Sequence, residues 1–302
     1  MSRRSTGILA VVVTSVLWGT TGTAATFAPA ASPLAIGSAA LGIGGLLQFA
    51  VAWRAVAGNR MPLARHRGVI IVAGMSVAVY PLAFYASMHL AGVAIGSVVS
   101  LASAPLFSGA LEALIDRRRP DARWILSVVL AVGGGTALIL SRAGGSGSGV
   151  VVGVVLGLVA GATYAVYSWA AHRLMDAGIP RSAAMGAIFG LGGILLMPVL
   201  TLTGAPLIAS AQAFTVAAYM ALVPMFLGYL LFGFGLARIA ASTATTVTLL
   251  EPAVATLLAV VVVGERPTTA GWIGMAAIAA SLLVLSLPAK EGDPGDRSAP
   301  MP

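Results

Sequence analysis

The sequence predicts an all-α polytopic membrane protein whose ten transmembrane helices form two inverted five-helix repeats. Hydrophobic residues make up 59% of the 302 residues and charged residues only 9%, whereas soluble domains carry about 25% charged residues. The apolar residues fall into stretches close to the roughly 20 residues that a membrane-spanning helix needs. Short motifs also recur at a constant spacing in the two halves. This composition excludes the two soluble domains that the length alone would allow.

Charged or turn-forming segments separate the five spans of the first half. Charged segments at 54–67 and 116–123 end the second and fourth spans, and turn residues at 28–32 and 88–91 end the first and third. The first span exceeds the 7–15 apolar residues of a signal peptide, so it is expected to be a retained helix. The predicted spans are 7–27, 33–53, 68–87, 92–115 and 124–141.

The second half begins after a Gly/Ser stretch at 144–149, which we interpret as a short flexible connector. Breaks at 172–180, 237–241 and 264–267 separate its helices. The predicted spans are 150–171, 181–203, 214–236, 242–263 and 270–288. The predicted organisation is a first repeat at 5–143, a second repeat at 150–288 and a disordered cytoplasmic tail at 289–302.

The basic residues predict the orientation of the chain in the membrane. With ten spans and the N-terminus in the cytoplasm, fifteen of the 17 lysine and arginine residues fall on the inner side. Only Arg142 and Arg266 then lie outside. Because cytoplasmic loops carry an excess of basic residues, the sequence predicts that both termini lie in the cytoplasm.

Repeated motifs support a duplication with opposite orientation, since five is an odd number of helices. Pro105 aligns with Pro252 at an offset of 147 residues, and Arg119-Pro120 aligns with Arg266-Pro267 at the same offset. Inverted repeats place a binding site near the membrane midplane and let each half adopt the other's conformation. The sequence therefore favours alternating access around a central site.

Several of these motifs resemble the EamA-type branch of the drug/metabolite transporter superfamily. The resemblance rests on Leu17-Trp18-Gly19 in the first span and on the helix 4 proline followed by the Pro120 loop. Its most specific features are Glu251-Pro252, Gly264-Glu265-Arg266-Pro267 and Gly271-Trp272-Ile273-Gly274. It covers residues 5–288, although the loop before Pro120 has no glutamate in the position of Glu265.

This resemblance implies a transporter of the inner or plasma membrane. It implies export of small metabolites such as amino acids, or of drugs, through a central cavity that opens alternately to each side. The expected partners are a small-molecule substrate, the lipid bilayer and, if transport is coupled, protons. We predict no cofactor, no metal and no enzymatic activity. Nucleic acid is excluded because the basic residues form no continuous face.

Glu251 is the sharpest candidate for a site residue. It lies near the centre of the predicted ninth helix, where an ionisable group costs about 2.5–3.5 kcal/mol to insert and therefore faces the interior or water. Its repeat partner is Ala104, and Thr248 lies one turn earlier on nearly the same face. Glu251 serves either as a proton site, as a partner for a substrate ammonium group, or as a hydrogen-bond donor to a carbonyl freed by Pro252.

Trp18 is the tryptophan predicted to lie near mid-depth, while the other four lie near span ends, where they act as interfacial anchors. It either lines the cavity or fills the bundle core. The six tyrosines are weaker candidates, among which Tyr80 and Tyr164 lie deepest. The predicted cavity residues are therefore Glu251, Trp18, Tyr80, Tyr164 and Thr248.

Prolines and glycines are expected to shape the bundle. Pro105 and Pro252 each remove a backbone donor and interrupt a helix at corresponding positions, which points to a binding site or to a simple kink. Small residues spaced by four, such as Gly153, Gly157 and Gly161, are typical of close helix packing in membranes.

The sequence therefore leaves three functions in competition. The leading one is a secondary exporter of small metabolites, either proton-coupled through Glu251 or uncoupled. A multidrug exporter of lipophilic cations uses the same fold. An intramembrane enzyme acting on lipid-linked substrates is the third, but the sequence offers neither paired deep carboxylates nor clustered histidines for catalysis. A primary pump is excluded because no phosphate-binding GxxxxGK motif is present.

Overall fold

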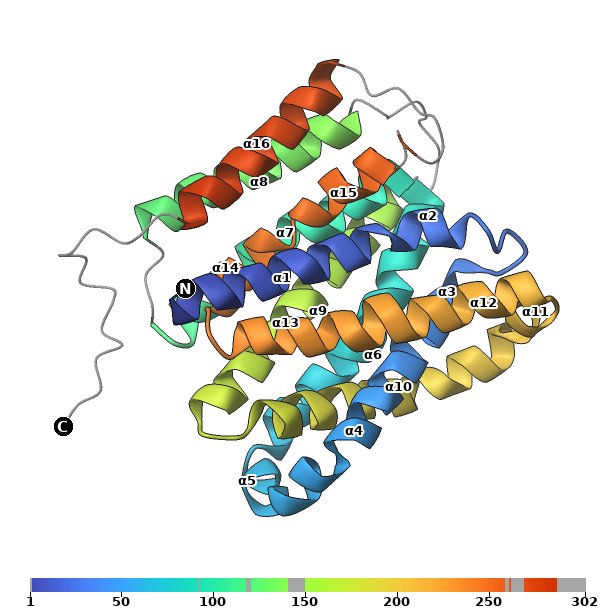
Figure 1. The fold of residues 1–302 in the computed structure, drawn as a ribbon, viewed down its shortest axis with the longest axis vertical. Helices are drawn as coiled ribbons and strands as arrows, with labels where there is room; N and C mark the ends of the chain where they lie inside the picture. Colours follow the sequence, from blue (N-terminus) through green and yellow to red (C-terminus); the bar gives the residue numbers. More distant parts are fainter. Residues whose placement is uncertain are drawn as a thin grey trace.

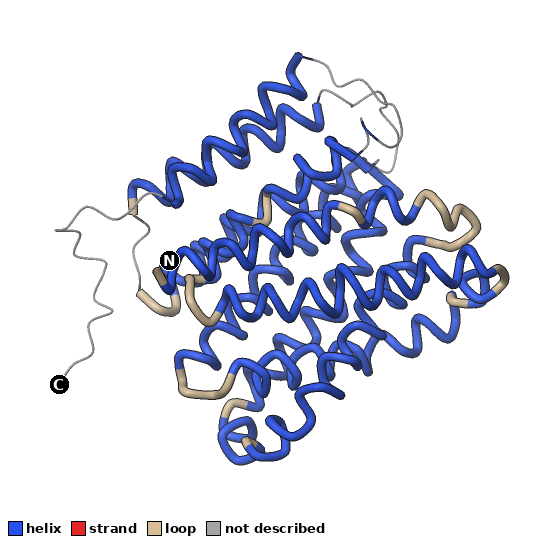
Figure 2. Tube along the Cα trace, viewed as in Figure 1, coloured by secondary structure: helices blue, strands red, loops and turns tan. Residues whose placement is uncertain are grey.

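A computed structural model describes residues 2–91, 93–117, 121–140, 150–258, 261 and 269–286. The described residues form helices joined by short loops, with no strand among them (Figure 2). Six helical segments in this part of the chain are long and apolar enough to cross a membrane. They are Arg3–Ala25, Pro33–Gly58, Arg67–Leu90, Val151–Asp176, Arg181–Thr203 and Ala211–Leu236.

The helices of the first half follow the predicted spans closely. Two short helices that the hydropathy pattern did not indicate also appear in the chain, α5 in this half and α11 in the second. The helical elements here are α1 (Arg3–Gly19), α2 (Thr21–Ala25), α3 (Pro33–Gly37), the π-helical segment η1 (Ser38–Ile43), α4 (Gly44–Gly58), α5 (Arg60–Arg65), α6 (Arg67–Ala91), α7 (Val93–Leu114) and α8 (Ala122–Leu140).

The second half contains a similar succession of long and interrupted helices. Its elements are α9 (Val150–Asp176), α10 (Arg181–Thr203), α11 (Ala205–Ile208), α12 (Ala211–Met220), the π-helical segment η2 (Ala221–Leu227), α13 (Gly228–Leu236), α14 (Ala241–Val247), α15 (Leu250–Leu258) and α16 (Thr269–Ser286). The predicted connector 144–149, the motifs Arg119-Pro120 and Gly264–Pro267, and the tail 289–302 lie outside the described residues.

Four of the predicted spans are not continuous α-helices. The first ends at Gly19 and resumes at Thr21, the ninth is divided at 248–249, and the second and eighth contain π-helical segments. At the first break, the Thr20 and Thr21 hydroxyls donate to the carbonyls of Leu17 and Trp18 at 2.6 and 2.7 Å. The π-helical segments η1 and η2 contact each other in the interior, and such wide turns are frequent at functional sites.

Packing brings the two halves of the chain together. In Figure 1, α8 and α16 lie side by side along one edge of the bundle, while α6 packs on α9 and α4 packs on α10. A Cβ atom at Gly161 of α9 would lie 2.6 Å from the Ser100 carbonyl oxygen of α7. The close helix approach that the glycine spacing predicts is therefore present between these two helices.

Candidate functional site

A small central cavity lies where α1, α6, α15 and the two π-helical segments meet. Its volume is about 20 Å³, which is room for roughly one water molecule. The site is therefore nearly closed in this conformation. Twelve residues line it: Trp18, Thr21, Gly37, Ala40, Leu41, Tyr80, Pro81, Phe84, Tyr85, Met225, Tyr229 and Glu251.

Glu251 enters this cavity from the break in the ninth predicted span. It is the second residue of α15, and its N–H donates to the Thr248 carbonyl at 2.9 Å across the break. Within the described residues, no group forms a hydrogen bond or ion pair with its side-chain carboxylate. An acidic group is favourable in the first turn of a helix because the N-terminal end of the helix dipole is positive. The carboxylate therefore lines the cavity from a helix start and is available to a ligand.

The helix interruption at Pro252 differs from the one that the sequence predicts. Pro252 lies in the first turn of α15, where its missing N–H would have no intrahelical partner in any case. The chain turns before it, at 248–249, so Glu251 sits at a helix start and not near a helix centre. Pro105 does lie inside a continuous helix, α7, but it does not line the central cavity.

Trp18 both lines the cavity and packs in the core. It is 4% exposed, and its ring centroid lies 4.7 Å from that of Tyr229. Its Nε1–H donates to the Pro224 carbonyl of η2 at 2.9 Å. The indole therefore contributes apolar surface to the cavity, while its polar group already has a partner within the fold.

Tyr164 and Thr248 lie behind the cavity and do not line it. The Tyr164 hydroxyl donates to Thr248 Oγ1 at 2.9 Å, and both residues are buried. Tyr167 and Tyr229 pair in the same way, with 2.8 Å between their hydroxyl oxygens. This pair of bonds stabilises the aromatic layer that surrounds the site.

Tyr80 and Tyr85 both line the cavity from α6. Among the described residues, neither hydroxyl forms a hydrogen bond with the protein. The sequence favours Tyr80 and Tyr164 over Tyr85, because Tyr85 lies less deep in its predicted span. Pro81 lies inside α6 and four residues before Tyr85, so the two residues share one face of the helix. Pro81 also lines the cavity, so a proline within the span is the sequence feature that indicates this face.

A second and larger cavity of about 670 Å³ lies toward the end of the bundle that holds α2 and the start of α12. Thr20 lines this cavity, whereas the next residue, Thr21, lines the central one. A hydrogen bond of 2.7 Å joins the Thr20 and Tyr219 hydroxyls. The bond from Thr20, at the break between α1 and α2, to Tyr219 of α12 therefore lies beside both spaces.

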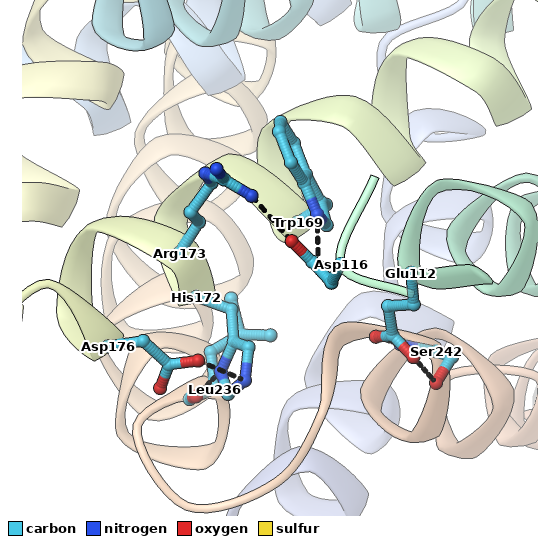
Figure 3. A network of polar contacts seen from close by, with 8 residues as sticks. All are labelled: Glu112, Asp116, Trp169, His172, Arg173, Asp176, Leu236 and Ser242. Carbon is cyan, nitrogen blue, oxygen red and sulfur yellow. Dashed lines mark hydrogen bonds and ion pairs between the residues drawn. The ribbon is translucent and has the colours of Figure 1, made fainter. Parts of the chain in front are cut away.

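At the opposite end of the bundle, two acidic residues of the first half bind the second half (Figure 3). The Glu112 carboxylate accepts from the Ser242 N–H at 2.8 Å and from the Ser242 hydroxyl at 2.5 Å. The Asp116 carboxylate accepts from Trp169 Nε1–H at 2.7 Å and from Arg173 Nη1–H at 2.5 Å. These contacts link α7 and the residues after it to α9 and to the start of α14.

Removing the Glu112 carboxylate is expected to loosen the contact between α7 and α14. A cysteine in place of Ser108 can be used to measure this loosening, since a maleimide reagent labels it faster when the contact opens. Ser108 is fully buried in α7 and accepts from the Thr245 hydroxyl of α14 at 3.2 Å. The native chain has no cysteine. We expect Glu112→Ala to raise the maleimide labelling rate of Ser108→Cys about tenfold, since hydrogen bonds to a charged group are lost. Asp121→Ala is the matched control, because its carboxylate accepts from Trp124 N–H at the start of α8. Equal labelling rates of Ser108→Cys with and without Glu112→Ala would contradict a role for Glu112 in holding α14 against α7.

Known proteins match both halves of the chain. The EamA-like transporter family matches residues 5–141 and again residues 151–287. The uncharacterized transporter YwfM of Bacillus subtilis (strain 168) is 33% identical over 283 residues, which cover 92% of this chain and 93% of the relative. A probable terminal-alkyne amino-acid exporter of Streptantibioticus cattleyicolor is 27% identical over 286 residues, covering 89% of this chain and 93% of the relative.

A solved crystal structure shares the fold. It superposes with a TM-score of 0.77 over 94% of this chain and 97% of the other, at 20% sequence identity. The family match and the related transporters indicate a multi-pass membrane transporter in place of the intramembrane enzyme considered from the sequence. On these grounds the chain belongs to the EamA-like transporter family.

Proposed function

We propose that this transporter exports small metabolites such as amino acids by alternating access around the central cavity, with proton coupling through Glu251. The observation that supports this proposal is the Glu251 carboxylate, which lines a buried cavity without a protein partner among the described residues. Ionisable residues inside a membrane mark substrate and ion pathways. Glu251 also lies beside a helix break, and discontinuous helices typically form the substrate and ion sites of secondary transporters.

We further propose that ten helices cross the membrane as two inverted repeats, at 5–143 and 150–288. The basic residues support an orientation with both termini in the cytoplasm of the inner membrane. In this orientation, the contacts of Glu112 and Asp116 hold the cytoplasmic end together, and the 670 Å³ cavity lies at the outer end.

Mass spectrometry of culture medium tests the proposed function. Cells that overproduce the native chain are compared with cells that produce Glu251→Gln at the same membrane level. We expect a metabolite to accumulate outside the cells with the native chain and to fall to background with the variant. Accumulation in both strains would uphold export but reject the role of Glu251, and accumulation in neither would reject export of cellular metabolites.

A multidrug exporter of lipophilic cations is the second candidate. Five aromatic side chains line the cavity together with Glu251, and no basic side chain is among the described lining residues. Aromatic faces and a carboxylate are the groups that bind quaternary ammonium ions. Increased resistance to quaternary ammonium compounds, without metabolite accumulation in the medium, would favour this candidate over the first.

A further inference from the structure

We propose that Tyr80, Tyr85 and Glu251 form a head-group site for a zwitterionic amino acid with an apolar side chain. This inference rests on the proposed export function and names the class of cargo that the cavity selects. It starts from the polar groups that line the cavity, because a membrane transporter must offer hydrogen-bonding partners to whatever polar groups it removes from water.

Several polar groups of the aromatic residues in and around the central cavity already have protein partners. Trp18 donates to a backbone carbonyl of η2, and Tyr229 pairs with Tyr167. The hydroxyls of Tyr80 and Tyr85 and the carboxylate of Glu251 line the same cavity and have no hydrogen-bond partner among the described residues. These three groups are therefore the ones available to a cargo molecule.

The three available groups match the two charged ends of an amino acid. Each phenol can donate one hydrogen bond, so Tyr80 and Tyr85 together suit the two oxygens of a cargo carboxylate. The ionised carboxylate of Glu251 accepts only, so it suits the cargo ammonium group. A bare carboxylic acid would meet the negative charge of Glu251 without any compensating ammonium group, which disfavours its binding.

Local packing places Tyr85 in this site. A Cβ atom at Gly37 of α3 would lie 2.6 Å from Cδ2 of Tyr85 and 3.3 Å from Cβ of Pro81. The absence of a side chain at Gly37 therefore lets the Tyr85 ring lie against α3. Tyr85 also packs edge-on against Phe84, with 5.3 Å between the ring centroids.

The remaining lining residues suit an apolar side chain. Ala40, Leu41, Phe84 and Met225 line the cavity together with the polar groups, and the indole of Trp18 adds further apolar surface. An apolar side chain gains about 25 cal/mol for each Å² of surface that it buries there. Because the cavity holds only about 20 Å³ in this conformation, cargo entry requires the surrounding helices to separate.

Binding measurements on the full-length protein in lipid nanodiscs test this site with three probes of one shape. Leucine carries both charged groups, 3-methylbutylamine lacks the carboxylate, and 4-methylpentanoate lacks the ammonium group. We expect the native protein to bind leucine about tenfold more tightly than the amine, since hydrogen bonds to the carboxylate are lost in the amine. The acid is expected to bind more weakly than both.

The variants Tyr80→Phe and Tyr85→Phe remove one hydroxyl each and keep the ring. We expect each to reduce the preference for leucine over the amine several-fold while leaving amine binding unchanged. Tyr164→Phe is the matched control, because its hydroxyl bonds to Thr248 and does not line the cavity. A general loss of packing would weaken amine and leucine binding alike, so the ratio separates the two effects.

Two outcomes would overturn this inference. One is native protein that binds the amine as tightly as leucine, with a ratio that Tyr80→Phe and Tyr85→Phe leave unchanged. The other is native protein that does not bind leucine at all. If culture medium still shows a Glu251-dependent metabolite in either case, the proposed function stands and only the head-group site fails. If it shows none, both fail.

Discussion

Glu251→Gln is expected to lower the rate of cargo efflux from proteoliposomes about thirtyfold or more. The substitution keeps the shape of the side chain but removes its charge and its ability to bind and release a proton. Removing one partner of a buried, hydrogen-bonded charge pair costs about 2–5 kcal/mol, and each 1.4 kcal/mol is a factor of ten. The effect is expected to be large because the described residues offer no second group that would pair with the cargo in place of this carboxylate.

The same variant separates coupled from uncoupled transport. An imposed proton gradient is expected to accelerate efflux by the native protein and to leave the residual efflux of Glu251→Gln unchanged. Glu251→Asp is the matched control, because it keeps a carboxylate at the start of α15 and should retain the response to the gradient with a lower rate. Gradient-independent efflux by the native protein would establish facilitated transport and contradict proton coupling at Glu251.

The sequence predicts the long helices well because hydropathy alone determines them. The predicted span 181–203 coincides with α10 (Arg181–Thr203), and the predicted span 68–87 lies within α6 (Arg67–Ala91). The interruptions are less predictable, since they depend on side-chain contacts. At the first break, for example, the hydroxyl of Thr20 bonds both to a preceding carbonyl and to Tyr219, about two hundred residues away in the chain.

Three of the predicted cavity residues, Glu251, Trp18 and Tyr80, line the central cavity. Depth along a span predicts which tyrosines lie near the midplane, but it does not predict which side of the helix faces the cavity. Tyr164 therefore lies behind the cavity, where it bonds to Thr248, while the shallower Tyr85 faces into it. Which hydroxyls remain available to a ligand depends on partners from distant helices, and a single sequence does not contain that information.

The hydrogen-bond partners of Glu112 and Asp116 also come from distant parts of the chain, so the sequence alone does not predict them. The sequence indicates an interfacial charge cluster at the end of the fourth predicted span, near the basic residues 117–119. In the structure, both carboxylates bind residues of the second half of the chain, including Ser242 and Arg173. The local pattern predicts salt bridges with the neighbouring arginines at the membrane surface, whereas the partners shown in the structure come from the other half of the chain.

Gly45→Ala is expected to destabilise the protein by about 3 kcal/mol or more, the upper end of the usual cost of overpacking a core. Gly45 lies where α4 crosses α10, and an added Cβ would press against the carbonyl oxygen of Phe189 and lie 3.2 Å from its carbonyl carbon. Both obstacles are backbone atoms, which do not rotate away as a side chain would. The two helices must therefore separate, and the loss extends to every contact along their shared face.

Gly58→Ala is the control for this prediction, because it changes the same residue type in the same helix. Gly58 is the last residue of α4, and no atom lies within 4 Å of its hypothetical Cβ. There the substitution is expected to be neutral or to stabilise the protein by up to about 1 kcal/mol, since alanine loses less conformational freedom than glycine on helix formation. In detergent, the midpoint of thermal unfolding should therefore fall for Gly45→Ala and should stay unchanged or rise for Gly58→Ala. Equal midpoints for both variants would show that α4 and α10 do not approach each other through Gly45. That result would also weaken the proposed site, because α4 continues from the π-helical segment that supplies Ala40 and Leu41 to the cavity.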